Sequence, residues 1–194
     1  MRLPLRYYGD PVLKRRATPV ATVDDRLRRL AQDMIETMHA EEGIGLAAQQ
    51  VGETVALCVV DVPAHCDADA EGRPLNPGLV MPMVMFNPHI IRASEPTEAR
   101  EEGCLSFPEI RAKIVRPSEV TVRWMDEDGR EREATLRGLT ARCVQHEMDH
   151  LDGILISDRM SPVMRIALGG RLKRLRQETE EALRLASAGG RRSG

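Results

Sequence analysis

The sequence has no apolar run long enough to cross a membrane. A membrane-spanning helix needs about eighteen consecutive apolar residues, and no stretch of the 194-residue chain provides them. Residues 1–10 also lack the uninterrupted apolar stretch of a signal peptide. We therefore expect neither a membrane partner nor export.

The sequence also has few cysteines and almost no net charge. The four cysteines include no CxxC pair and are too few for a secreted disulfide framework of this length. Reduced thiols in the cytoplasm fit better, and one of them could ligate a metal. The 28 basic and 30 acidic side chains leave a formal charge of -2, which gives no support for a DNA or other polyanion partner.

A chain of 194 residues is long enough for one hydrophobic core, so we expect a single domain over residues 1–186. Residues 187–194 are expected to form a flexible tail. Within the domain, residues 61–85 contain prolines, glycines and acids without a sustained period, which predicts a surface excursion. Its length makes this excursion the strongest candidate for disorder.

Local patterns predict helices at both ends of the chain. In the N-terminal part, Asp24 and Asp25 precede apolar residues at helical spacing, which predicts a helix that stops near Gly43. A β-strand is expected at Val55 to Val60. Near the C-terminus, Ser161-Pro162 should cap a last helix from Val163 to about Leu185, bent or weakened at Gly169-Gly170.

A β-hairpin is predicted between these ends. Val120, Val122 and Trp124 alternate with more polar neighbours, and Asp128-Gly129 supplies a turn into residues 130–136.

The most informative pattern is a pair of histidines four residues apart, His146 and His150, in a chain that has only five histidines. Positions i and i+4 share one face of a helix, so both imidazoles can bind one divalent ion. Glu147 directly follows the first histidine and is a candidate general base. The helix is expected to begin near Thr140 and to end at Gly153 with a left-handed cap.

A catalytic metal usually takes three protein ligands, so one ligand is still to be found. The zinc-peptidase pattern HExxHxxGxxH would place a histidine where this chain has Ile156, which disfavours that class. Cys143 lies about 10.5 Å from His150 along a helix, too far for one helix to supply all three ligands. Cys104 follows a glycine and is the strongest candidate, the alternative being a buried structural cysteine. Three further histidines are isolated and are weaker candidates: His39, His65 and His89.

Three segments together resemble the peptide deformylase family. They are GIGLAAQQ at residues 43–50, EGCLS at 102–106 and QHEMDH at 145–150. The opening YGDPVL at residues 8–13 is also similar, so the resemblance covers most of residues 3–175. It implies an α+β fold in which antiparallel β-sheets wrap around a central metal-binding helix, with an N-terminal and a C-terminal helix.

The activity that this resemblance implies is removal of the N-formyl group from N-formylmethionyl nascent peptides, with release of formate. The implied metal ligands are Cys104, His146 and His150. The family uses Fe²⁺ in cells, and Zn²⁺ or Ni²⁺ is expected to occupy the same site in some preparations.

The same resemblance assigns catalytic roles. It implies that Glu147 is the acid and base, and that Gln50 and the backbone N–H of Leu105 stabilise the oxyanion. Gly45 would line the mouth of the site. Together with Gly43, it would leave room for a formyl hydrogen while crowding larger acyl groups.

The resemblance also implies a pocket for methionine and supporting charges. Ile44, Leu139 and Cys143 are candidates for the apolar pocket, and ordinary core positions are the alternative. Glu102 and Arg116 would pair beneath the site, and Asp149, next to His150, is a candidate for a carboxylate that supports the metal ligands from behind. A plain surface ion pair is the alternative for Glu102 and Arg116.

Two features go beyond the resemblance. The excursion at residues 61–85 looks longer than in many relatives, so its part in substrate access is open. The last helix carries a basic run that could touch ribosomal RNA, although interleaved acids favour an ordinary solvated face. The run consists of Arg171, Lys173, Arg174 and Arg176.

Two other functions compete with deformylation. A metallopeptidase that cuts internal peptide bonds would leave the segment at residues 102–106 unexplained. A metal-binding protein without catalysis, such as a redox sensor, would need neither Glu147 nor Gln50.

Overall fold

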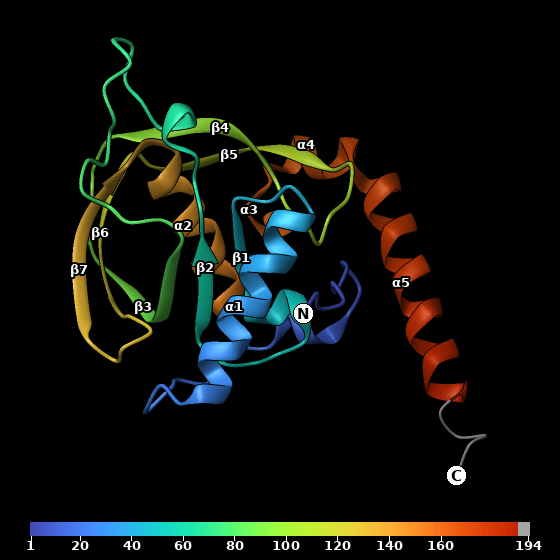
Figure 1. Ribbon diagram of the computed structural model, residues 1–194. Helices are drawn as coiled ribbons and strands as arrows, with labels where there is room; N and C mark the ends of the chain where they lie inside the picture. The colour runs from blue at the N-terminus through green and yellow to red at the C-terminus, as the bar shows by residue number, and fades with distance from the viewer. Residues whose placement is uncertain (190–194) are drawn as a thin grey trace.

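Helix α2 (Gly138–Leu151) runs through the middle of the molecule, with β-strands around it (Figure 1). The computed structural model describes residues 1–189. The strands are β1 (Gly45–Ala47), β2 (Leu57–Val60), β3 (Met83–Ala93), β4 (Thr97–Gly103), β5 (Arg111–Pro117), β6 (Glu119–Met125) and β7 (Glu131–Arg137). The other α-helices are α1 (Asp25–Ala40), α3 (Ile156–Arg159), α4 (Pro162–Ala167) and α5 (Gly169–Gly189).

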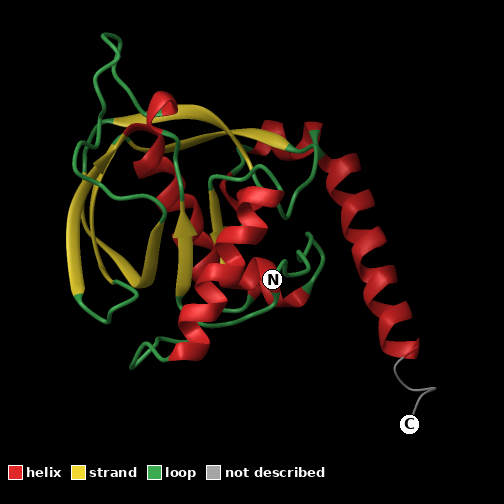
Figure 2. Cartoon of the chain, in the orientation of Figure 1, coloured by secondary structure: helices red, strands yellow, loops and turns green. Residues whose placement is uncertain are grey.

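The strands form two antiparallel sheets. One is five-stranded with the order β1-β2-β3-β6-β7, and the other pairs β4 with β5. Helix α2 contacts strands of both sheets, and Figure 2 shows helices and strands packed together. The predicted α+β fold with a central helix is confirmed. The predicted hairpin is β6-β7, where Gly129 takes a φ of 79° in the turn.

Strand β2 explains how two helices pack on one sheet. Leu57 and Val59 point into a core shared with α1, whereas Cys58 and Val60 point into a core shared with α2. All four residues have no exposed surface. Alternate side chains of a strand face opposite sides, so β2 is buried on both faces and fixes α1 and α2 on either side of the sheet.

Helix α1 begins and ends close to the predicted positions. The side chain of Asp24 accepts a hydrogen bond from the Leu27 amide and caps its N-terminus. Six apolar residues of α1 face the core: Leu27, Leu30, Ala31, Met34, Ile35 and Met38.

Helix α2 begins two residues before the predicted start near Thr140. The carboxylate of Asp67, far away in the sequence, accepts hydrogen bonds from the Leu139 amide at 2.8 Å and the Thr140 hydroxyl at 2.6 Å. Amides in the first turn of a helix lack partners within the helix, so Asp67 caps α2 from a distant segment. The predicted left-handed residue after the helix is Gly153, with a φ of 72°.

The excursion is shorter and better anchored than predicted. Residues 83–85 belong to β3 and are buried, so the boundary at residue 85 is wrong. The prediction of disorder is also wrong for the base of the excursion, because Asp67 is only 6% exposed and bonds α2. The side chain of Asn76 adds hydrogen bonds to the backbone of Arg137.

The last helix of the prediction is two helices, α4 and α5, which separate at Leu168 just before Gly169. Helix α5 lies along the outside of the molecule (Figure 1), and near its start Leu172 is buried in a cluster with Leu13 and Phe107. Helix α5 continues to Gly189, past the expected start of the tail at Ser187, and residues 190–194 lie outside the described part. Within residues 1–189, every helix is too short or too polar to span a membrane.

Candidate metal centre

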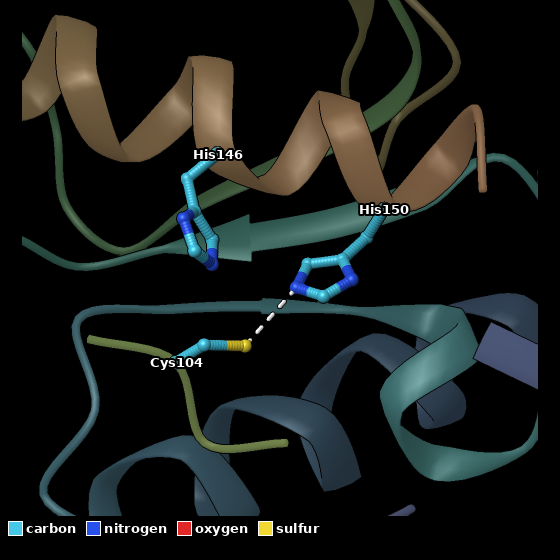
Figure 3. Close-up of side chains that lie close together, drawn as sticks. All are labelled: Cys104, His146 and His150. Carbon is cyan, nitrogen blue, oxygen red and sulfur yellow. Dashed lines mark hydrogen bonds between the residues drawn. The ribbon is translucent and has the colours of Figure 1, made fainter. Parts of the chain in front are cut away.

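Cys104, His146 and His150 come together from two elements. Both histidines project from α2 toward Cys104, which lies just after the end of β4 (Figure 3). One ligand atom from each residue lies within 4.8 Å of the others, and Cys104 Sγ is 3.3 Å from His150 Nε2. This is the only such group of three or more potential ligands among residues 1–189.

The chemistry of these donors fits a zinc or ferrous ion. A thiolate with two imidazoles is a ligand set that both ions accept, and three protein ligands leave a position open for a reactant. Burial lowers the pKa of His150 well below its ordinary value, which favours the neutral imidazole that binds metal. His150 is 1% exposed and His146 8% exposed.

Glu102 supports His146 from the side opposite the thiol. His146 Nδ1 donates to Glu102 Oε2 at 3.0 Å, which leaves Nε2 available as a ligand. Burial alone would raise the pKa of Glu102, but hydrogen bonds with His146 and Arg116 outweigh burial and lower it to about 2. Glu102 is therefore a carboxylate near neutral pH and fixes the His146 ring.

Arg116 joins Glu102 to Asp149. Its Nε and Nη2 donate to the two oxygens of Glu102 at 2.7 and 3.0 Å, and its Nη1 donates to Asp149 Oδ2 at 2.8 Å. Asp149 also accepts from Arg159 at 2.6 Å. Asp149 thus holds Arg116, which in turn holds Glu102, while His150 Nδ1 has no hydrogen-bond partner among residues 1–189.

Glu147 lies in the site as a buried carboxyl group. It is 3% exposed, and its Oε2 has no hydrogen-bond partner among the described residues. Burial raises the pKa of Glu147 to about 7, although the charges of His146 and Arg116 act against the rise. A carboxyl group with a pKa near 7 can both take up and return a proton at neutral pH.

Gly45 faces Glu147 at very short range. A Cβ at this position would overlap Glu147 Oε1 and would lie 2.6 Å from Cys143 Sγ. Gly43 has a similar restriction, because its Cβ would lie 2.8 Å from the Leu105 side chain. A side chain at either position would therefore displace a neighbour, and Gly45 is the one that borders the Glu147 carboxyl group.

Gln50 is oriented by its neighbours. Its Oε1 accepts from the Ala47 amide at 2.8 Å, so the amide NH₂ is directed to the other side. Nε2 lies 3.6 Å from Cys104 Sγ and 3.3 Å from Ser106 Oγ. The backbone N–H of Leu105 makes no hydrogen bond with residues 1–189. Two donors thus stand beside the cysteine.

A cavity of about 300 Å³ opens onto this site. Its lining contains every residue predicted for catalysis and for the methionine pocket, as well as Glu102, Cys104 and His146, whereas Arg116, Asp149 and His150 lie behind it. The predicted residues in the lining are Gly43, Ile44, Gly45, Gln50, Leu105, Leu139, Cys143 and Glu147.

The sequence reasoning missed Arg142 and Asp67. Arg142 lines the cavity and is 6% exposed. Arg142 lies four residues before His146, so both share one face of α2. This spacing could have predicted from the sequence that Arg142 lies near the metal ligands. No local signal marks Asp67 as a helix cap. The isolated histidines stay outside the metal group, and His39 bonds Asp61 at 2.7 Å.

Comparisons with known proteins agree with the motifs. The family model described as "Polypeptide deformylase" matches residues 2–165. A protein named peptide deformylase from Opitutus terrae is 43% identical, covering 97% of this chain and 100% of the relative. Among solved structures, peptide deformylase from Thermotoga maritima is 41% identical with a TM-score of 0.72, covering 84% of this chain and 99% of that one.

A second solved structure, the peptide deformylase of Synechococcus elongatus, is 39% identical with a TM-score of 0.76 and covers 89% of this chain and 85% of that one. The family model covers more than half of the chain, and the relatives match along most of their length. The chain therefore belongs to the peptide deformylase family, whose members are hydrolases that remove the N-formyl group from nascent peptides.

Proposed function

We propose that this chain deformylates N-formylmethionyl peptides at the cavity beside α2, with Cys104, His146 and His150 holding one divalent ion. The observation that carries the proposal is the convergence of one thiol and two imidazoles next to a buried carboxyl group, Glu147. When bound, the ion supplies Lewis acidity to the formyl oxygen and to the attacking water. The remaining steps belong to the protein's own side chains.

Glu147 handles the protons. In the proposed reaction, a water oxygen bonds to the formyl carbon while Glu147 takes one proton from that water at a carboxylate oxygen. The C–N bond then breaks, and Glu147 passes the proton to the leaving amine. The products are formate and a peptide with a free methionine amine. A pKa of about 7 suits both transfers at neutral pH.

Gln50 and Leu105 are proposed to hold the oxygen that gains charge. The NH₂ of Gln50 is directed toward Cys104 by the bond between its Oε1 and the Ala47 amide. A donor already oriented in this way costs no reorganisation during the reaction, and losing one such donor typically costs about 3 kcal/mol of transition-state stabilisation. The free Leu105 N–H is the second donor.

The apolar wall of the cavity is proposed to receive methionine. Ile44, Leu139 and Cys143 form part of its lining. Gly43 and Gly45 would leave room for the formyl hydrogen while crowding larger acyl groups. A Gly45→Leu variant that kept full activity would contradict this explanation of selectivity.

Formate release tests the proposed function. Protein purified without oxygen should release formate from formyl-Met-Ala-Ser, and a chelator should abolish the release. In the same assay, acetyl-Met-Ala-Ser should be a much poorer substrate. Cleavage of internal peptide bonds without formate would favour a metallopeptidase, and absence of both products would favour a metal-binding protein without catalysis.

Ferrous iron is the proposed ion in cells, with zinc or nickel able to replace it. The thiolate and imidazole donors accept all three, so the donor set alone does not choose. Metal analysis of protein isolated without oxygen should find iron at one ion per chain. Protein isolated without oxygen that carries stoichiometric zinc and no iron would contradict iron as the ion in cells.

We further propose that residues 1–186 form one catalytic domain in the cytoplasm, where nascent chains arise. All four cysteines are free thiols, which agrees with a reducing compartment. The basic run on α5 is a second candidate surface, for ribosomal RNA. Co-sedimentation with ribosomes, compared between the wild type and a variant with alanine at Arg171, Lys173, Arg174 and Arg176, tests this role.

A further inference from the structure

Arg142 is a buried arginine that none of the roles above uses. It lies on α2 one turn before His146, and only 7% of its side chain is exposed. A buried guanidinium is costly unless its donors and its charge are matched. Its partners therefore indicate what the side chain does.

Arg142 contacts three groups on the two-stranded sheet. Its Nη1 donates to Glu102 Oε1 at 2.6 Å and to the Ile114 carbonyl at 3.1 Å. Its Nη2 donates to the Glu98 carbonyl at 2.7 Å. The backbone contacts fix the guanidinium against β4 and β5, and the remaining contact is an ion pair with Glu102.

The carboxylate of Glu102 is consequently held from several directions. Oε1 accepts from Arg116 Nε and from Arg142 Nη1. Oε2 accepts from Arg116 Nη2 and from His146 Nδ1. With Oε1 held by two arginines, rotation of the carboxylate is blocked, and Oε2 is kept facing the His146 ring.

Arg116 alone would not serve Glu102 in the same way. Its third donor is engaged with Asp149, so its charge is shared between two buried carboxylates. Arg142 contacts Glu102 and makes no hydrogen bond to a second carboxylate among residues 1–189. The second guanidinium therefore completes the charge balance at Glu102.

We propose that Arg142 is a positioning residue for the metal ligand His146 and acts through Glu102. The inference rests on the proposed metal site. Loss of Arg142 frees one side of the carboxylate, the hydrogen bond to His146 Nδ1 weakens, and the imidazole is less well oriented toward the ion. Changes in groups that orient metal ligands typically weaken metal affinity by about 10- to 100-fold, and we expect about tenfold because Arg116 remains.

Release of cobalt from the loaded protein tests the proposal without an activity assay. Wild type and Arg142→Met are loaded with Co²⁺, mixed with excess chelator, and followed by the thiolate-to-cobalt absorption. Arg142→Met should release cobalt about tenfold faster. Arg142→Lys keeps a cation near Glu102 and should lie closer to wild type. Arg176→Met is the control, because Arg176 is exposed on α5 and pairs with Glu180, and it should release cobalt at the wild-type rate.

A double-variant comparison separates positioning from simple support of the fold. In a Glu102→Gln background, Arg142→Met should add little to the release rate, because the group through which Arg142 acts is already changed. A tenfold effect that persists in this background would overturn the proposal. Equal acceleration by Met and Lys would also overturn it, since the backbone ties to β4 and β5 would then be what matters.

Two further outcomes complete the test. If Arg142→Met does not fold, Arg142→Gln is measured in the same way, because its amide can still reach a backbone carbonyl. If either folded variant releases cobalt at the wild-type rate, the proposed role of Arg142 is overturned, whereas the proposed metal site is not. A wild-type protein that binds cobalt without thiolate absorption would overturn the proposed metal site and this inference with it.

Discussion

Helix α2 buries Arg142, Glu147 and Asp149, whereas helix α5 leaves Arg174 and Arg176 in solvent. Each charge on α2 meets a specific group on another element or faces the cavity. On α5, the two arginines pair with acids one turn later on the same helix, Glu178 and Glu180. Burial makes the α2 charges strong and directional, and exposure leaves the α5 pairs weak.

The buried charges of α2 orient groups in the site, whereas the exposed charges of α5 keep that helix solvated. Removing one member of a buried pair leaves the other uncompensated, at a typical cost of about 3–5 kcal/mol. An exposed pair contributes about 0–1 kcal/mol and is screened by salt. Four substitutions test whether the two helices differ as strongly as this contrast requires.

Glu147→Gln should give the largest effect. It removes the group proposed to move the proton, so kcat for formate release should fall about 1000-fold, as expected for loss of a general base. The measurement is steady-state kinetics with formyl-Met-Ala-Ser, together with metal content. Glu180→Gln on α5 is the matched control and should keep wild-type kcat. An active Glu147→Gln enzyme with its metal bound would remove Glu147 from the mechanism.

Arg116→Met should give the largest loss of stability. It leaves Glu102 with Arg142 and Asp149 with Arg159, so we expect a loss of about 3 kcal/mol, the lower end for a broken buried pair. Urea unfolding at equal metal loading measures the change, because bound metal also adds stability. Arg176→Met on α5 is the control and should change the free energy of unfolding by less than about 1 kcal/mol. Similar losses in both variants would erase the contrast between the helices.

Asp67→Ala should have an intermediate effect. The substitution removes the acceptor for the Leu139 amide and the Thr140 hydroxyl at the start of α2, which is worth about 1–2 kcal/mol as a helix cap. Thermal or urea unfolding measures the loss, and amide hydrogen exchange should rise first at Leu139. Glu71→Ala, at an exposed position of the same excursion, should be neutral. An unchanged Asp67→Ala protein would mean that the excursion does not support α2.

The smallest effect is expected from the basic run on α5. Alanine at its four positions should change the free energy of unfolding by less than about 1 kcal/mol, since the two exposed pairs are weak and alanine favours helix. Formate release should be unchanged, and added salt should narrow any difference further. A large loss of stability would show that α5 depends on its charges much as α2 does.

The sequence revealed the parts of the molecule in which neighbours along the chain carry the signal. Apolar spacing and Asp24 predicted α1, and alternation with Asp128-Gly129 predicted the β6-β7 hairpin. The i and i+4 spacing placed His146 and His150 on one face. Cys104 needed family motifs in addition, because its approach to α2 depends on the tertiary path of β4.

What the sequence did not reveal depends on contacts between distant segments. Asp67 caps a helix that begins 71 residues later, since Gly138 is its first residue, and no pattern around Asp67 announces this role. The break between α4 and α5 falls just before Gly169-Gly170, where one helix was expected to bend or weaken. No local pattern predicted the contact of Asp149 with Arg116, which lies 33 residues away in the sequence.

X-ray absorption spectroscopy of the zinc-loaded protein tests the central claim most directly. The account predicts one sulfur neighbour at about 2.3 Å and two imidazole nitrogens at about 2.0–2.1 Å, with the sulfur lost in Cys104→Ser. A spectrum with nitrogen and oxygen neighbours only, or one whose sulfur survives Cys104→Ser, would contradict a metal held by Cys104, His146 and His150.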